Sequence, residues 1–187
     1  MRIIGGTYGG RVIQSPKGLP VRPTTDRTKE ALFNLLRHRL DWAGLRVLDL
    51  FAGTGNLTLE FWSRGVAEVV SVDQNRRCVA AIKGHLRTLG IEGGQVLCME
   101  VGRFLRHNDR AFDLVFMDPP YAMPGQEELI RHILSGPALA PAGLLIVEHA
   151  AQVSFDHLPG FEQRRSYGTS LLSFFERRDS LPEALQL

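Results

Sequence analysis

Short apolar runs alternate with amphipathic stretches along most of the chain between residues 46 and 148. Apolar residues recur at helical spacing in the stretches, which predicts helices, and the runs between them predict strands. Short apolar runs separated by helices are typical of parallel strands buried on both faces of a sheet. The expected strands are Arg46–Leu50, Glu68–Val72, Gln95–Met99, Phe112–Met117 and Gly143–Glu148, and the expected helices are Asn56–Ser63, Arg76–Leu89, Gly102–Arg106 and Gln126–Leu134.

The two ends of the chain depart from this alternation. Two further strands, Phe161–Tyr167 and Leu171–Arg177, follow one another without a helix, which predicts an antiparallel hairpin. Near the start, residues 1–13 predict two short strands joined by a glycine-rich turn. Thr24, Thr25 and Asp26 then offer N-cap side chains to a predicted helix that runs to about Leu40. We therefore predict an α/β fold: a doubly wound, mostly parallel, seven-stranded Rossmann-like sheet with an antiparallel C-terminal hairpin and a small N-terminal β-hairpin extension. We expect residues 1–23 to form the hairpin and linker, residues 24–178 the main domain and residues 179–187 a tail.

The composition fits one globular domain of 187 residues, 44% of them hydrophobic, which can bury a core without disulfides. Cys78 and Cys98 lie in no CxxC pair, so we expect reduced thiols and a cytoplasmic protein. The chain shows neither an apolar signal core at its start nor an apolar run of about 18 residues, so we expect neither export nor a membrane partner. The histidines show no metal-ligand spacing, and we expect no metal.

Charge is distributed unevenly, although the formal net charge is only +2. Residues 1–46 hold nine Lys and Arg against three Asp and Glu, a formal charge of +6, and the remaining residues carry −4. A basic arm on a neutral or acidic body is a pattern of nucleic-acid-binding proteins. A solvated charged helix gives the same pattern, so charge alone leaves both interpretations open.

The first candidate site lies where the strand from Arg46 turns into a helix through two glycines. Glycines allow a sharp bend and a close approach of the backbone to a ligand, but a dinucleotide fingerprint would need a third glycine where Thr58 stands. Asp49 would repel a diphosphate and suits an ammonium group, while Asp73 lies where a carboxylate can bind both hydroxyls of a ribose. These features favour S-adenosyl-L-methionine, and the alternative is a tight turn with incidental acids. The loop residues predicted to bind the cofactor are Asp49, Phe51, Ala52, Gly53, Thr54, Gly55 and Asn56.

The second candidate site is Asp118-Pro119-Pro120-Tyr121, directly after a buried strand. Two prolines fix two φ angles, so the neighbouring carbonyls point in set directions. Asp118 and the Pro119 carbonyl can accept the two N–H bonds of a planar amine, and Tyr121 can stack on the ring that carries it. Drawing both protons toward acceptors frees the nitrogen lone pair for attack. A Pro-Pro turn with a local Asp cap is the alternative, but an open α/β sheet places both motifs in one crevice.

With these motifs the chain resembles the class I S-adenosylmethionine-dependent methyltransferases of the RsmD type, which methylate N2 of a guanine in small-subunit ribosomal RNA. The resemblance covers about residues 1–177. It also rests on Arg2-Ile3-Ile4-Gly5-Gly6, on Arg22-Pro23-Thr24-Thr25-Asp26-Arg27 with Glu30-Ala31-Leu32-Phe33-Asn34, on Val147-Glu148 and on Tyr167-Gly168-Thr169.

The resemblance implies roles for further residues. Thr24, Thr25 and Asp26, with Arg27, are expected to close over the cofactor. Asp73, Gln74, Glu100 and Val101 complete the implied cofactor site, with Asp73 where the family commonly has Glu and Glu100 where it usually has an Asp near the adenine amino group. The implied RNA-binding residues are Arg2, Arg11, Lys17, Arg22 and Arg27. The expected partner is ribosomal RNA in the small subunit or its assembly intermediate, bound by a monomer.

Other functions remain to be separated from this one. An amino-methyltransferase acting on DNA adenine N6 or on protein glutamine could use the same tetrad, although the chain has little room for a DNA target-recognition domain. A non-catalytic ribosomal RNA-binding assembly factor would have no need of Asp118 and the glycine loop. A nicotinamide oxidoreductase fits least, because Thr58 replaces the third glycine.

Overall fold

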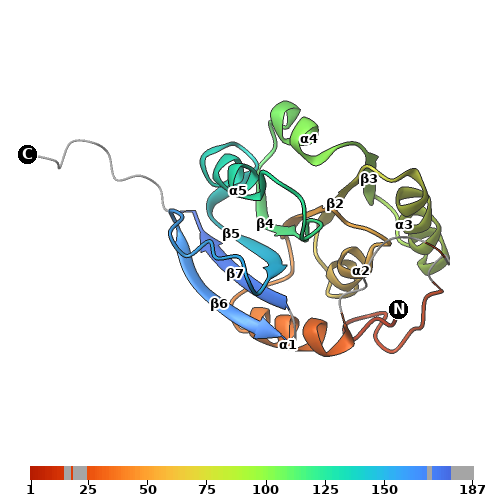
Figure 1. The fold of residues 1–187 in the computed structure, drawn as a ribbon. Helices are drawn as coiled ribbons and strands as arrows, with labels where there is room; N and C mark the ends of the chain where they lie inside the picture. The colour runs from red at the N-terminus through yellow and green to blue at the C-terminus, as the bar shows by residue number, and fades with distance from the viewer. Residues whose placement is uncertain (15–17, 19–24, 168–169, 178–187) are drawn as a thin grey trace, which may run out of the picture.

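The computed structural model describes residues 1–14, 18, 25–167 and 170–177. Within this part, seven strands form one sheet in the order β3-β2-β1-β4-β5-β7-β6 (Figure 1). The strands β1 to β5 run parallel, while β7 lies antiparallel between β5 and β6. The strands are β1 (Arg46–Leu50), β2 (Glu68–Asp73), β3 (Gln95–Cys98), β4 (Phe112–Met117), β5 (Leu139–Ala150), β6 (Phe161–Tyr167) and β7 (Ser170–Glu176).

Helices cover both faces of the sheet because alternate strand residues are apolar on each side. On one face, Val47, Phe116 and Ile146 pack against residues of α1 and α2. On the other face, Leu48, Val115 and Leu145 pack against residues of α4 and α5. The prediction of a doubly wound α/β sheet is therefore confirmed. The helices are α1 (Asp26–Leu36), α2 (Asn56–Ser63), α3 (Arg76–Leu89), α4 (Val101–His107) and α5 (Gln126–Ser135).

Several predicted bounds are confirmed to the residue, namely those of β1, β4, β6, α2 and α3. Other predicted bounds differ by one residue at one or both ends, and those of α1 and β5 are wrong by more. The helix α1 ends at Leu36 rather than near Leu40, and tighter turns that close on the Leu35 and Leu36 carbonyls follow it. The strand β5 begins at Leu139, where Pro141 and the positive φ of 56° at Ala142 interrupt the apolar pattern without ending the strand.

The N-terminal segment is smaller than the predicted two-stranded hairpin. Its antiparallel pairing is an isolated bridge between Arg2 and Val12. Ile3 and Ile13 are buried in a cluster with Leu59 of α2 and with residues of α3. Burial of these two isoleucines, rather than a regular ladder of hydrogen bonds between strands, therefore holds the segment against the body of the protein. No helix in the described part of the chain is long and apolar enough to cross a membrane.

Candidate functional site

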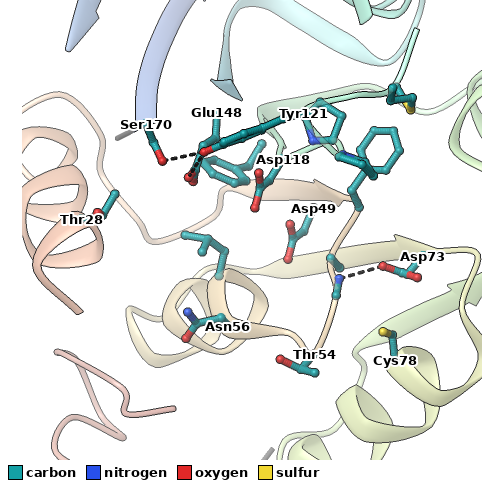
Figure 2. Close-up of a pocket in the computed structure, with 18 of the residues that line it drawn as sticks. Thr28, Asp49, Thr54, Asn56, Asp73, Cys78, Asp118, Tyr121, Glu148 and Ser170 are labelled. Atoms are coloured by element: carbon teal, nitrogen blue, oxygen red, sulfur yellow. Dashed lines mark hydrogen bonds between the residues drawn. The ribbon is translucent and has the colours of Figure 1, made fainter. Parts of the chain in front are cut away.

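A cavity of about 1270 Å³ opens at the carboxyl ends of β1, β2, β4 and β5. The chain reverses its direction of travel across the sheet between β1 and β4, which is the switch point where open α/β sheets bind ligands. Its walls come from the loops after these strands, from α1 and from the β6–β7 hairpin. Figure 2 shows side chains of both candidate motifs in this cavity. The prediction that topology brings the two motifs together is confirmed.

The glycine loop is built from backbone conformations that favour glycine. Gly53 and Gly55 have φ values of 54° and 84°, and Gly55 caps the start of α2. A Cβ atom on Gly55 would lie 2.9 Å from Cγ1 of Ile82 in α3, so only glycine lets the two helices approach this closely. Phe51 is also held at a positive φ of 60°, a strained conformation that is typical of functional sites. The loop therefore presents backbone to the cavity.

Asp73 ties the end of β2 to this loop. Its Oδ2 accepts a hydrogen bond of 2.8 Å from the Gly53 amide, and its Oδ1 accepts one of 2.7 Å from the Asn75 amide. Each carboxylate oxygen can accept a further hydrogen bond. Because Asp73 also lines the cavity, both of its oxygens are oriented for a ligand that carries two hydroxyls.

Three carboxylates, Asp49, Asp118 and Glu148, line the cavity near the ends of β1, β4 and β5 (Figure 2). Asp49 is buried, and the Thr58 hydroxyl donates to its Oδ2 at 2.5 Å. Burial raises the pKa of Asp49 to about 7, and the charge of Asp73 adds to the rise. Burial also raises the pKa of Asp118 well above its usual range, with the charges of Glu148 and Asp49 adding to it. Cationic groups and hydrogen-bond donors of a ligand would favour the ionised carboxylates.

The Asp118-Pro119-Pro120-Tyr121 loop is held from two sides. The side-chain amide of Gln126 donates to the carbonyls of Pro120, Tyr121 and Met123 at 3.2, 3.3 and 3.1 Å. On the other side, the Tyr121 hydroxyl lies 2.6 Å from Oγ of Ser170 in β7. These contacts hold the loop in place. The Pro119 carbonyl is not one of the three carbonyls that Gln126 bonds.

Most of the residues predicted to bind the cofactor or to act in catalysis line the cavity. Asp26 and Gly55 do not: Asp26 forms ion pairs with Arg2 and Lys29, and Gly55 packs against α3. Thr24, Lys17 and Arg22 lie outside the described residues. The predicted residues in the wall are Thr25, Arg27, Asp49, Phe51, Ala52, Gly53, Thr54, Asn56, Asp73, Gln74, Glu100, Val101, Asp118, Pro119, Pro120 and Tyr121.

Glu100 has a second function in the fold. Its carboxylate caps α4 by accepting hydrogen bonds of 2.7 Å from the Gly102 amide and 2.6 Å from the Arg103 amide. Glu100 therefore reaches the cavity wall with both oxygens already oriented by the helix. The two predicted RNA-binding arginines of the N-terminal segment, Arg2 and Arg11, do not line the cavity and are exposed at the surface.

Sequence reasoning missed several residues of the wall. Glu148 belongs to a motif of the resemblance that assigns it no role, and its place at the end of a buried strand is a usable signal. Ser166, Tyr167 and Ser170 reach the wall from the β6–β7 hairpin. Tyr167 belongs to a motif of the resemblance that assigns it no role, and no local motif marks Ser166 or Ser170. Sequence reasoning also missed Lys29, which is buried outside the cavity wall. Its ammonium group contacts Glu60 at 3.1 Å and the Asn56 side chain at 3.0 Å.

Comparison with known proteins identifies the family. Residues 1–176 match the family described as Conserved hypothetical protein 95. The chain is 33% identical over 159 residues to Ribosomal RNA small subunit methyltransferase D of Escherichia coli strain K12, covering 85% of this chain and 79% of that protein. It is 34% identical over 152 residues to the protein of the same name from Haemophilus influenzae, covering 79% and 78%. The solved structure of a hypothetical protein from Thermus thermophilus has a TM-score of 0.82 at 33% identity and covers 94% of this chain and 99% of that chain. The chain therefore belongs to the Conserved hypothetical protein 95 family, that of the RsmD-type methyltransferases.

Proposed function

We propose that the protein transfers the methyl group of S-adenosylmethionine to the exocyclic N2 amine of a guanine in small-subunit ribosomal RNA. The observation that carries the proposal is the meeting of the glycine loop and the Asp118-Pro119-Pro120-Tyr121 loop in one cavity. The names of the relatives from Escherichia coli and Haemophilus influenzae support the RNA substrate and the small subunit.

The residues of the cavity fit this cofactor. Asp73 presents two oriented oxygens to a ribose, and the glycine loop gives backbone access beside it. Asp49 supplies a buried negative charge for the ammonium group of the amino-acid moiety. Glu100 and Val101, next to β3, supply a polar and an apolar contact for the adenine. When bound, S-adenosylmethionine supplies an electrophilic methyl group on a positively charged sulfur.

The Asp118 loop positions the amine that attacks this methyl group. The Asp118 carboxylate and the Pro119 carbonyl accept the two N–H bonds of the amine, and the Tyr121 ring stacks on the base. Holding the nucleophile in a fixed place accounts for much of the rate of such a displacement. The raised pKa of Asp118 also suits it to take up the proton that the amine releases.

RNA binding is proposed for the basic side chains near the cavity. Arg27 lines the wall, and Arg2 contacts the preceding residue, Asp26, at 3.2 Å. Arg11, in the same N-terminal segment as Arg2, is exposed to solvent. These guanidinium groups would contact RNA phosphates, which position the substrate without reading its sequence. We further propose that the protein acts as a monomer on the small subunit or on its assembly intermediate.

The test compares methyl transfer with cofactor binding in Asp118→Ala. Small subunits that lack the modification serve as substrate, and calorimetry measures the affinity for S-adenosylmethionine. We expect transfer to fall by about 100-fold or more while the affinity changes by less than about threefold. The control is Asp156→Ala, which removes an exposed carboxylate paired with Arg164. Equal losses of transfer and binding in Asp118→Ala would contradict the role of Asp118.

A further inference from the structure

Glu148 lies beside Asp118 at the edge of the sheet. Val147 of β5 pairs in parallel register with Met117 of β4, so the next residues, Glu148 and Asp118, are neighbours on the same face. Neighbouring strands lie about 4.8 Å apart. Glu148 is only 6% exposed and lines the cavity. Two carboxylates are therefore held side by side in a buried site.

This arrangement is unfavourable for the protein without a ligand. The charge of Glu148 is one of the causes that raise the pKa of Asp118, and burial removes water that would stabilise either charge. The Tyr121 hydroxyl donates to Oε1 of Glu148 at 3.5 Å and lies 2.6 Å from Oγ of Ser170. A ligand that brings several hydrogen-bond donors would relieve the repulsion.

The order of the acidic side chains places Glu148 on the side of the base. Figure 2 shows Asp118 between Asp49 and Glu148, and the charges of both neighbours act on it. Asp49 adjoins the glycine loop, where the cofactor is proposed to bind, and Glu148 lies beyond Asp118, next to Tyr121 and Ser170. If Asp118 holds the amine of a base, the ring atom next to that amine on the same edge of the base would therefore face Glu148.

We infer that Glu148 selects guanine by accepting the hydrogen bond of its N1–H while Asp118 and the Pro119 carbonyl hold the N2 amine. This inference rests on the proposed function and adds a residue that determines the base. Guanine carries donors at N1 and at the adjacent N2, which match two neighbouring carboxylates. Adenine and 2-aminopurine have an unprotonated N1, and a carboxylate facing that acceptor lone pair repels it.

The test compares guanine with 2-aminopurine, which keeps the 2-amino group and lacks the N1 proton. RNA substrates carry either base at the methylated position, mapped first with the wild-type protein and introduced by ligation. We expect kcat/KM of the wild type to be at least about 100-fold higher for guanine, because a buried acceptor would lose its donor in 2-aminopurine. In Glu148→Gln the side-chain amide can donate to an unprotonated N1. We expect the guanine preference to fall at least about tenfold, with transfer to 2-aminopurine increased.

A matched control and the cofactor affinity make the result decisive. Glu127→Gln changes a half-buried carboxylate outside the cavity wall and should keep the wild-type preference. The affinity of Glu148→Gln for S-adenosylmethionine should stay within about threefold of the wild type. An unchanged guanine preference in Glu148→Gln, or a loss of cofactor affinity equal to the loss of transfer, would overturn the inference. If the wild type methylates no guanine in any RNA, the proposed function itself fails, and the inference fails with it.

Discussion

At the scale of single residues, the cavity combines buried carboxylates with a ligand that is proposed to be cationic. A buried carboxylate whose pKa is raised binds a proton more tightly in the folded protein than in the unfolded chain. For Asp49 this means that ionisation destabilises the ligand-free fold as the pH rises from about 4 to about 7. When a cation binds, the ionised form of Asp49 is favoured over the protonated form, because the ligand's positive charge stabilises the ionised carboxylate.

We predict that the affinity for S-adenosylmethionine rises with pH between about 5.5 and about 7. Below the pKa of Asp49, which is about 7, binding must release a proton, so the affinity should increase by up to about tenfold for each pH unit. Calorimetry in buffers of different ionisation enthalpy measures both the affinity and the released proton. Asp49→Asn should bind weakly and with little dependence on pH, whereas Asp156→Asn should behave like the wild type. A pH-independent affinity in the wild type would contradict the assignment of Asp49 to the ammonium group.

At the scale of elements, α5 supports the Asp118-Pro119-Pro120-Tyr121 loop, which is proposed to be catalytic, through one side chain. Gln126 is buried at the first position of α5 and bonds three carbonyls of the loop that follows β4. It contributes nothing to the cavity wall itself, so its effect on the reaction passes through the loop. Gln126 is therefore a positioning residue.

We predict that Gln126→Ala lowers kcat by about tenfold and leaves the affinity for S-adenosylmethionine within about twofold of the wild type. The loss of three hydrogen bonds should let the Pro119 carbonyl move, and small displacements of a positioned group are costly in rate. Steady-state kinetics with labelled cofactor checks this, and Glu128→Ala, which truncates an exposed side chain of the same helix, is the control. An unchanged kcat in Gln126→Ala would show that the two prolines hold the loop without help.

Buried Lys29 joins α1, α2 and the N-terminal segment. Its ammonium group contacts Asp26 at 3.3 Å, Glu60 at 3.1 Å and the carbonyl of Arg2. Glu60 is also buried, accepts from the Ile4 amide at 2.8 Å and pairs with Arg64. The glycine loop is part of the same network, because Lys29 also donates to the Asn56 side chain.

We predict that Lys29→Met lowers the free energy of unfolding by about 3 kcal/mol, because it removes one partner from a buried ion pair. Urea titration followed by circular dichroism measures the change. Arg131→Met, which breaks an exposed pair with Glu127, should change stability by less than about 1 kcal/mol. Equal effects of the two substitutions would mean that the buried network contributes no more than a surface pair.

A feature of the fold or of the site could be predicted from the sequence when the residues that form it lie close together in the chain. Apolar runs bounded by turns predicted β1 and β4 correctly, and two local motifs predicted ten of the residues in the cavity wall. The pairing of β7 with β5 places Ser170 near Tyr121, and sequence order gives no sign of this crossover. Lys29 could have been found, because it lies three and seven residues before Leu32 and Leu36 on the buried face of α1. Burial of a charge at such a position requires partners from other elements, and these are visible only in the structure.

At the scale of the whole molecule, the basic N-terminal segment is held against the body beside the cavity. Ile3 and Ile13 are buried, whereas the side chains of Arg2 and Arg11 remain exposed. The segment can thus present positive charge in a fixed place near the proposed substrate site.

We predict that replacing both Arg2 and Arg11 with Gln weakens RNA binding and reduces its salt dependence. Each lost phosphate contact on single-stranded RNA should reduce the slope of log affinity against log salt by about 0.7, so two contacts give a reduction of about 1.4. Filter binding of small-subunit RNA between about 50 and about 200 mM salt measures the slope. Arg131→Gln, on α5 at the opposite face of the sheet, is the control. An unchanged slope in the double variant would place the RNA surface elsewhere.

The protein is proposed to methylate N2 of a guanine in small-subunit ribosomal RNA in this cavity. The most direct measurement incubates the protein with labelled S-adenosylmethionine and, separately, small subunits lacking the modification, naked small-subunit RNA, duplex DNA and a protein extract. The products are digested and the labelled species is identified by chromatography and mass. Labelled N2-methylguanosine from the subunits or the RNA is the predicted result. Label in adenine of DNA or in glutamine, or no label with the cofactor still bound, would contradict it.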